Sequence, residues 1–340
     1  METRRLGSSG IEVSAFGLGT MMFGAWGNPD RDQCRQMLDM ALEAGITLVD
    51  TADIYDFGVS EDMLGEFLGD RRDRVVLATK FGNAMDDDPQ HRGGSRRWVR
   101  EAVTDSLRRM RTDHIDLYQM HRPDPDVPFE ETLGALDELV REGLVRAVGT
   151  SNFPSEQIVE SQWIAARRGF VRPTSEQPPY SILCRGVERA VLPMCRRYDE
   201  GAVVWAPLNG GWLTGKYRRD QEPPAASRAA REPEHFDHGS GWRETKLDLV
   251  EHLEKIATEA GVSLTGLALG FALAHPAVSA VLIGPRTPEQ LADLLTLADV
   301  RLDNDTLAAI DAVVPPGTDV NPADAGYTPS WLEPDRLRGV

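Results

Sequence analysis

The sequence predicts a (β/α)8 barrel, the TIM barrel, with an N-terminal hairpin, a C-terminal helix and a tail. Eight short apolar or β-branched runs alternate with segments whose apolar residues recur every three or four positions. This alternation is typical of parallel strands joined by crossover helices. The first run continues into Gly17-Leu-Gly-Thr and lacks the GxGxxG pattern expected in an open dinucleotide-binding sheet, which favours the closed barrel.

The elements follow in a regular order along one domain of 340 residues. A hairpin is expected within residues 1–14, where Gly7-Ser-Ser-Gly10 separates two short extended runs. The barrel and the C-terminal helix take residues 15–313, and the tail takes 314–340. The expected strands are residues 15–19, 46–50, 75–79, 115–119, 145–149, 174–177, 203–206 and 279–283. The expected helices are residues 31–44, 60–68, 96–110, 129–141, 155–168, 186–198, 243–260 and 288–297.

Glycines mark the ends of many helices, as expected where a left-handed residue closes the last turn. They are Gly45, Gly69, Gly143, Gly169, Gly201 and Gly261. Three longer segments, 81–95, 208–242 and the tail, lie outside this repeat, and long loops of this kind in compact domains are usually functional lids or disordered. Substrate identity is expected to depend mainly on residues 22–29, 86–95, 217–242 and the tail.

Composition excludes several classes of function. A net charge of −17 disfavours nucleic acid as a partner. The start of the chain has no apolar signal region, so we expect a cytoplasmic protein. The apolar stretch 264–284 is interrupted by His275-Pro276, which indicates a buried helix and strand rather than a membrane span. The sequence leaves open whether the protein forms a homo-oligomer.

Metal sites are not expected. Cys34, Cys184 and Cys195 are isolated and are interpreted as reduced thiols. The Asp86-Asp-Asp88 run is interpreted as a solvated loop tip because no EF-hand spacing follows it. His235 and His238 have no third ligand nearby in sequence.

Polar side chains follow successive strands at the end of the barrel where active sites of this fold lie. Asp50 ends the second strand with Tyr55 five residues later, Lys80 follows the third strand, and His121 follows the fourth. A phenol with a pKa of about 10 is a weak acid at neutral pH, and a neighbouring ammonium lowers that pKa. We therefore expect Lys80 to tune Tyr55 as a proton donor to a carbonyl oxygen.

The other two groups complete this chemistry. A buried lysine needs a carboxylate such as Asp50 to stay charged. His121 could donate a hydrogen bond to the carbonyl oxygen. Taken singly, each group has a simpler interpretation: Asp50 with Lys80 as a core ion pair, and His121 as a loop histidine. Trp26 and the preceding Met21, Met22 and Phe23 are expected to line an apolar mouth or to pack in the core.

Six sequence segments, in order, resemble the aldo-keto reductase superfamily. They are Leu48-Val-Asp-Thr-Ala-Asp-Ile-Tyr55, Leu77-Ala-Thr-Lys-Phe-Gly82, Leu117-Tyr-Gln-Met-His-Arg-Pro-Asp124, Val148-Gly-Thr-Ser-Asn-Phe153, Pro207-Leu-Asn-Gly-Gly-Trp-Leu-Thr-Gly-Lys-Tyr217 and Ile283-Gly-Pro-Arg-Thr-Pro-Glu-Gln-Leu291. The resemblance runs from about Leu6 to Val313 and includes the branch of channel β-subunits. It implies that Asp50, Tyr55, Lys80 and His121 form a catalytic tetrad, with Tyr55 as the general acid.

The resemblance also implies an NADPH site. Ser151, Asn152 and Gln177 would hold the nicotinamide carboxamide, and Trp205 would stack on the ring. Small residues of segment 208–216 would approach the pyrophosphate, and Arg286 at a helix start would favour a 2′-phosphate and hence NADPH. The implied cofactor residues are Ser151, Asn152, Gln177, Trp205, Pro207, Leu208, Gly211, Leu213, Gly215, Lys216, Gly284, Arg286, Gln290 and Asp293. Taken alone, Trp205 fits core packing and Arg286 a solvated helix start.

The chain departs from this pattern at two positions. Asp293 is followed by Leu294 where many relatives have asparagine, and Glu176 precedes Gln177 where asparagine is frequent. The resemblance implies NADPH-dependent reduction of an aldehyde or ketone to an alcohol. The alternative is a cofactor-binding, redox-sensing regulatory subunit with slow turnover. A metal-dependent hydrolase and a short-chain dehydrogenase are disfavoured, because the first strand lacks HxH and the chain lacks YxxxK.

Overall fold

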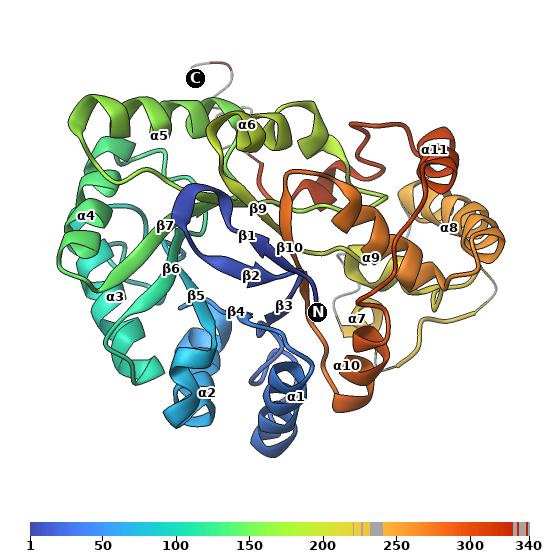
Figure 1. Cartoon of the computed structure of the whole chain (residues 1–340), viewed down its shortest axis with the longest axis horizontal. Coiled ribbons are helices and arrows are strands. Elements are labelled where there is room, and N and C mark those ends of the chain that lie inside the picture. Colours follow the sequence, from blue (N-terminus) through green and yellow to red (C-terminus); the bar gives the residue numbers. More distant parts are fainter. Residues whose placement is uncertain (220, 226, 232–240, 329–331, 333–337, 339–340) are drawn as a thin grey trace.

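The computed structural model describes residues 1–219, 221–225, 227–231, 241–328, 332 and 338. Eight parallel strands close into a barrel in the order β10-β3-β4-β5-β6-β7-β8-β9, with helices around it (Figure 1). A separate antiparallel pair, β1 and β2, precedes the barrel. The expected fold class is confirmed.

The strands and helices have the following bounds. The strands are β1 Thr3–Arg5, β2 Glu12–Ser14, β3 Phe16–Gly19, β4 Leu48–Asp50, β5 Val76–Phe81, β6 Ile115–Met120, β7 Val145–Ser151, β8 Ser175–Gln177, β9 Gly201–Val204 and β10 Val278–Ile283. The helices are α1 Arg31–Glu43, α2 Val59–Leu68, α3 Arg96–Met110, α4 Phe129–Arg141, α5 Ser155–Arg168, α6 Val191–Tyr198, α7 Arg228–Arg231, α8 Gly241–Glu259, α9 Leu264–Ala274, α10 Pro288–Leu295 and α11 Asn304–Val313.

The alternation of side chains along the strands produces two apolar layers. The outer layer lies between the strands and the surrounding helices. The inner layer fills the barrel with apolar side chains that come from several strands, among them Leu48, Leu117 and Val203. Leu6 and Val13 of the hairpin belong to this inner cluster, so the hairpin closes one end of the barrel.

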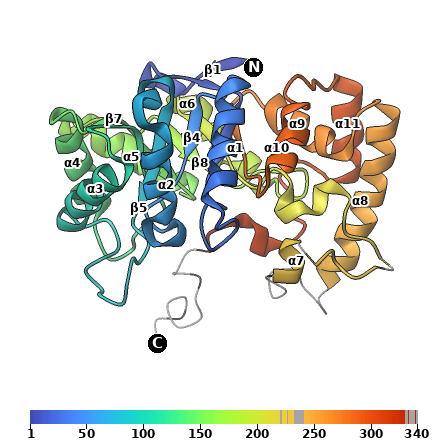
Figure 2. The ribbon, with the colours of Figure 1, turned by 90° about the horizontal axis from the view of Figure 1, so that it is seen from below.

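The two ends of the barrel therefore differ. In Figure 2 the hairpin lies along the upper edge, and the dark red turn Pro322–Ala325 lies on the lower side. Because all eight strands are parallel and start at the hairpin end, their carboxyl ends open toward the other side. The strand-to-helix loops meet there.

Local signals explain several element boundaries. Asp30 caps α1 by accepting from the backbone N–H groups of Asp32 and Gln33, and Ser95 caps α3 in the same way. The prediction of a single helix at 186–198 was wrong. Gly186–Arg189 forms a 3-10 turn, and α6 starts only at Val191. Ala190 between them has φ −145°, outside the helical region.

The apolar stretch 264–284 forms α9 and β10, as expected for a buried helix and strand. Within the described residues, no single helix has the length and apolar composition needed to cross a membrane. The pair α8 and α9 meets these criteria only when taken together, across an 86° bend.

Candidate active site

Four polar side chains converge at the carboxyl ends of β4, β5 and β6. Lys80 Nζ donates to Asp50 Oδ1 at 2.6 Å and to the Tyr55 hydroxyl at 3.3 Å. It also donates to the backbone carbonyl of Thr51 at 2.7 Å. The imidazole of His121 meets the Tyr55 ring edge-on, with centroids 5.9 Å apart. The structure thus brings together the four residues that the sequence predicted as a tetrad.

Lys80 is charged despite complete burial. Its side chain has no exposed surface, and burial by itself would lower its pKa. Asp50 and the oxygen of Tyr55 outweigh this effect, so that the pKa of Lys80 lies above its ordinary value. The charge of Asp50 therefore favours the ammonium form of Lys80, and its part in a catalytic tetrad stays a prediction.

The acidity of Tyr55 differs from the expectation. We expected Lys80 to bring the pKa of this phenol below its usual value. Lys80 does act in that direction, but burial is the larger effect and raises the pKa of Tyr55. The raised pKa favours the protonated hydroxyl of Tyr55, which lies next to the Lys80 ammonium.

His121 is neutral. Burial, followed by the positive charges of Lys80 and Arg122, holds the pKa of its imidazole well below the usual range. The side-chain amide nitrogen of Asn83 lies 3.2 Å from His121 Nδ1. Since an amide N–H donates to Nδ1, the proton of the neutral ring is on Nε2, where it can be donated to a ligand oxygen.

Residues predicted to hold a nicotinamide lie beside this tetrad. The amide nitrogen of Asn152 donates to Ser151 Oγ at 2.9 Å and to the His121 carbonyl at 3.2 Å. Gln177 Nε2 donates to Asp50 Oδ2 at 2.9 Å, which links the predicted cofactor residues to the tetrad. Asn152 Oδ1 is buried and has no partner among the described residues. A buried acceptor without a donor fits the N–H of a carboxamide ligand.

Glu176, one of the two departures from the family pattern, supports the turn that carries Asn152. It is fully buried, accepts from Thr150 Oγ1 at 2.5 Å and accepts from the backbone N–H of Phe153 at 3.1 Å. Asn152 itself has φ 60°, so the turn needs such support. Burial raises the pKa of Glu176 to about 8.

The loop after β9 suits the approach of a phosphate. Trp205 lies just past the strand, and the loop residues Gly210, Gly211 and Gly215 have φ of 65°, 99° and 72°. Gly211, at φ 99°, has a backbone conformation that other residues rarely adopt, and the end of the flexible Lys216 side chain lies beside it. Pro207 and Leu213 are buried beneath the loop, and Leu208 is half-buried.

A group of cations borders this loop. Partial burial, followed by the charges of Arg286 and Arg231, lowers the pKa of Lys216, and burial followed by Arg231 lowers that of Arg286. Mutual repulsion of cations is relieved by a bound anion. Gln290 Oε1 accepts from the Arg286 backbone N–H at 2.9 Å at the start of α10. A side chain at Gly284 would meet open space.

Asp293 is exposed on α10. No hydrogen bond or ion pair of its side chain is found within the part of the chain that the structure describes, and its expected role toward adenine stays a prediction.

The C-terminal segment crosses the mouth of the site. A Cβ on Gly326 would lie 2.6 Å from Trp205 Cζ2 and 2.8 Å from Asn152 Oδ1. Asp324 accepts from Asn209 Nδ2 at 3.0 Å and from Lys246 Nζ at 2.7 Å, which ties the segment to the loop after β9 and to α8. The backbone at Gly326 therefore lies close to Trp205 and Asn152, two of the predicted nicotinamide residues.

The segment after β3 contributes one aromatic side chain to the mouth. Trp26 is 38% exposed and its ring centroid lies 6.4 Å from that of Tyr55. Phe23 is fully buried and Met22 nearly so, which places both in the core. The expectation of an apolar mouth therefore applies to Trp26 and not to these two residues.

Sequence reasoning assigned no role to four residues that the structure brings to the site. Asn83 contacts His121, and Gln119 Nε2 lies 3.4 Å from Asp50 Oδ2. Asp53 is buried, and burial followed by the charge of Glu61 raises its pKa well above the usual range. Arg122 follows His121 directly. Of these, only Arg122 had a sequence signal, a charged residue immediately after a predicted catalytic strand end.

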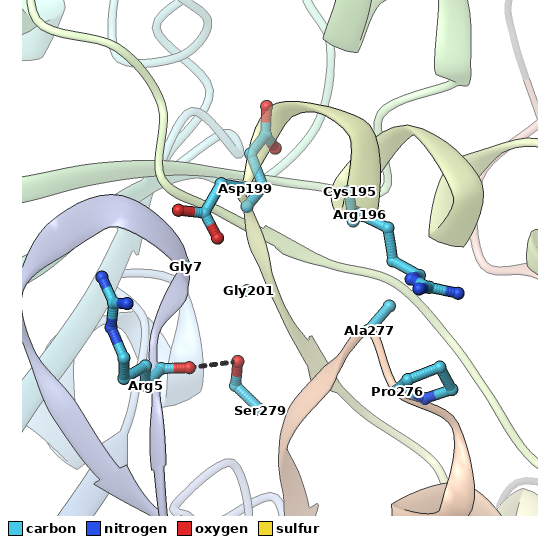
Figure 3. A pocket seen from close by; sticks show the side chains of 10 residues that line it. Arg5, Gly7, Cys195, Arg196, Asp199, Gly201, Pro276, Ala277 and Ser279 are labelled. Atoms are coloured by element: carbon cyan, nitrogen blue, oxygen red, sulfur yellow. Dashed lines mark hydrogen bonds between the residues drawn. The ribbon is translucent and has the colours of Figure 1, made fainter.

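A cavity of about 260 Å³ lies at the opposite end of the barrel (Figure 3). Its lining includes Gly201 and Ser279, which lie at or near the start of their strands, and Arg5 of the hairpin. Ser279 Oγ donates to the Arg5 carbonyl across it at 2.7 Å. The cavity is remote from the tetrad.

Among the described residues, no three His, Cys, Asp or Glu side chains are grouped so as to hold a metal ion. His235 and His238 lie outside the described residues.

Comparisons with known proteins relate the chain to one family. A family model described as "Aldo/keto reductase family" matches residues 15–315. An uncharacterized oxidoreductase of Bacillus subtilis, YrpG, is 36% identical over 340 residues, covering 97% of this chain and 98% of that protein. The aldo-keto reductase YhdN of the same organism is 34% identical, covering 92% of this chain and 94% of YhdN. A putative voltage-gated potassium channel subunit beta of Schizosaccharomyces pombe is also 34% identical, with 92% of each chain covered.

Proposed function

The chain belongs to the aldo/keto reductase family, and on this basis we propose that it reduces an aldehyde or ketone to an alcohol with NADPH. One observation carries the proposal: a buried, charged Lys80 lies 3.3 Å from the Tyr55 hydroxyl and is held by Asp50 at 2.6 Å. Such an arrangement lets a phenol give up its proton at the moment when negative charge forms on a neighbouring oxygen.

Each residue of the tetrad has its own step. His121 donates from Nε2 to the carbonyl oxygen of the substrate and orients it beside Tyr55. As negative charge develops on that oxygen, the Tyr55 hydroxyl transfers its proton to it. The Lys80 ammonium stabilises the tyrosinate that is left, and Asp50 keeps Lys80 charged. Solvent then returns a proton to Tyr55.

The residues beside the tetrad would hold NADPH, which would supply the hydride for the carbonyl carbon. Support comes from the unpartnered Asn152 Oδ1, which would accept from the carboxamide, and from the positive φ of Gly210, Gly211 and Gly215 in the loop after β9. Lys216 and Arg286 would face the phosphates. The preference for NADPH over NADH rests on Arg286, because a guanidinium at a helix start suits a 2′-phosphate.

Removal of one hydroxyl tests the proposal. Tyr55→Phe should lower kcat for carbonyl reduction about 1000-fold, because the general acid is lost, while NADPH binding stays near that of the parent. The measurement is the rate of NADPH oxidation with a panel of small aldehydes and ketones, followed by the absorbance of the reduced nicotinamide. A fully active Tyr55→Phe variant would exclude Tyr55 as the acid.

Tyr118→Phe is the matched control. Tyr118 is buried on β6, and its hydroxyl has no hydrogen-bond partner among the described residues. Its removal takes away the same atom without breaking a bond seen in the structure, so turnover should stay within about 3-fold of the parent.

The second candidate function is a redox-sensing regulatory subunit, which the similarity to a putative potassium channel subunit beta favours. Such a subunit needs the same tetrad but not rapid turnover. Single-turnover oxidation of bound NADPH without steady-state cycling on any panel member would identify the sensor. Rapid multiple turnover identifies the enzyme.

A further inference from the structure

Arg122 places a guanidinium at the mouth of the candidate active site. It follows His121 directly at the end of β6, and its side chain is half-buried. Nη1 donates to the carbonyl oxygen of Gly326 at 2.8 Å, and the guanidinium carbon lies 6.0 Å from the centroid of the Tyr327 ring. Both contacts are made with the C-terminal segment.

No carboxylate within 4.0 Å balances this charge among the described residues. Other arginines with restricted exposure have such partners: Arg72 pairs with Asp116, Arg109 with Glu61, and Arg185 with Glu188. In a chain with 54 acidic and 37 basic residues, a half-buried arginine without an acid is unexpected. Burial accordingly lowers the pKa of Arg122.

The guanidinium lies within electrostatic reach of two of the reacting groups. Its charge contributes to the low pKa of His121, and it interacts electrostatically with Tyr55. The carbonyl that it binds belongs to Gly326, whose Cβ position is 2.6 Å from Trp205 and 2.8 Å from Asn152 Oδ1. An oxygen held by Arg122 is therefore close to the residues proposed to bind nicotinamide.

We infer that Arg122 determines the substrate class by binding an anionic group, a carboxylate or a phosphate, carried by the carbonyl compound. This inference rests on the proposed reductase function. We place that anion where the Gly326 carbonyl oxygen accepts from Arg122 Nη1. An anionic oxygen replaces this carbonyl because charge-assisted hydrogen bonds to a guanidinium are stronger than bonds to a neutral carbonyl.

A purely structural role would make Arg122 a clamp for the tail. The clamp would affect all carbonyl substrates alike, whereas anion binding changes the ratio between acidic and neutral ones. The test therefore compares matched pairs: 4-oxobutanoate with butanal, and glyceraldehyde 3-phosphate with glyceraldehyde. The two pairs separate carboxylate from phosphate as the preferred group.

The parent protein should prefer the acidic member of at least one pair by about 10- to 100-fold in kcat/KM. Arg122→Gln should reduce that ratio to about 1, mainly by raising KM, and Arg122→Lys should restore part of it. Arg197→Gln is the control, because Arg197 is exposed on α6 and its loss changes the net charge equally. This control should keep the parent ratio.

A binding measurement separates failure of this inference from failure of the reductase proposal. Calorimetry with butanoate, which cannot react, should give a Kd about 10-fold or more higher for Arg122→Gln than for the parent. Turnover of aldehydes without any acid preference would overturn the role of Arg122 and leave the reductase proposal intact. If no aldehyde were turned over but butanoate binding still depended on Arg122, the reductase proposal would be overturned and the anion site would stand. Equal butanoate affinity in both proteins would overturn the anion site in either case.

Discussion

His121 can act as a hydrogen-bond donor only while it is neutral with its proton on Nε2. Two features of its surroundings secure this state. Burial and the charge of Lys80 keep its pKa well below the usual value, and the amide of Asn83 donates to Nδ1. Asn83 does not reach the reacting atoms itself, so it is a positioning residue that acts through His121.

We expect a flat pH profile for reduction. His121 stays neutral because its pKa is lowered, and Tyr55 stays protonated because its pKa is raised. The value of kcat/KM for reduction should therefore be level between about pH 6 and about pH 9, and should fall only as Tyr55 loses its proton at higher pH. A change in kcat/KM near the ordinary pKa of histidine would contradict the assignment of His121 as neutral.

Asn83→Asp should make kcat/KM depend on pH near neutrality. A carboxylate at this position accepts from Nδ1, moves the ring proton away from Nε2 and raises the pKa of His121. Reduction should fall about 10- to 100-fold, with a new pH dependence near neutrality, both read from kcat/KM profiles. Asn304→Asp on the exposed start of α11 adds the same charge far from the site and should leave the profile flat.

The tetrad could be predicted from single residues because each member stands at a fixed offset from a strand end. Asp50 ends β4, Lys80 lies within β5, and His121 follows β6. Asn83 could not be predicted, because its contact depends on how the loop after β5 folds back on His121. The sign of the pKa shift of Tyr55 was missed for a similar reason: the degree of burial is not encoded in spacing.

Two helical glycines show how packing can reverse a local preference. Gly65 lies within α2 where that helix meets α3, and a Cβ there would be 2.7 Å from the backbone carbonyl carbon of Met110. Gly134 lies within α4, and a Cβ there would be 3.5 Å from the ring of Phe170, an ordinary contact. Alanine is the better helix former at both positions.

Alanine substitution should therefore have opposite effects at these two positions. Gly134→Ala should stabilise the protein by up to about 1 kcal/mol through helix propensity. Gly65→Ala should destabilise it by about 1–3 kcal/mol, because the α3 backbone has to move away. Urea unfolding of both variants measures the difference. If Gly65→Ala matched Gly134→Ala, the close approach of α2 to α3 would be wrong.

The order of elements was predictable because each strand and helix carries its own periodicity and stop signals. Seven expected helices overlap closely with α1 to α5, α8 and α10. The break in the segment 186–198 was missed, because the apolar spacing continues through Ala190 while the backbone does not. The seventh strand was expected at 203–206, but β9 ends at Val204 and leaves Trp205 outside the sheet.

The distribution of charge over the whole molecule has one feature that composition hides. Most acidic residues lie on the surface, but Glu176 and Glu200 are buried near each other. Glu176 lies in β8, and Glu200 directly precedes the neighbouring strand β9. Glu200 Oε1 accepts from Gln162 Nε2 at 2.7 Å, while Oε2 has no partner among the described residues. Burial raises the pKa of Glu200 from 4.5 to about 7 and that of Glu176 to about 8.

These two carboxyls make global stability depend on pH. Because both pKa values are raised, the folded protein binds more protons than the unfolded chain between about pH 4.5 and about pH 8. The contribution of the two carboxyls to the free energy of unfolding is therefore fully present below about pH 4.5. It is lost as the pH rises through that window. Glu200→Gln keeps the acceptor for Gln162 and removes the titration. The variant should be more stable than the parent at pH 8, on the order of 1–3 kcal/mol, and nearly equal to it at pH 4.5.

Urea unfolding of the parent and Glu200→Gln across this pH range measures the difference, and Glu259→Gln is the control. Glu259 is exposed near the end of α8, so its removal changes the net charge by the same amount without relieving burial. The stability difference between Glu259→Gln and the parent should therefore vary little with pH. If Glu200→Gln behaved like this control, Glu200 would have to titrate near its ordinary pKa in the folded protein. In that case solvent would reach its carboxylate, and the packing of Gln162 over the start of β9 would be looser than the structure shows.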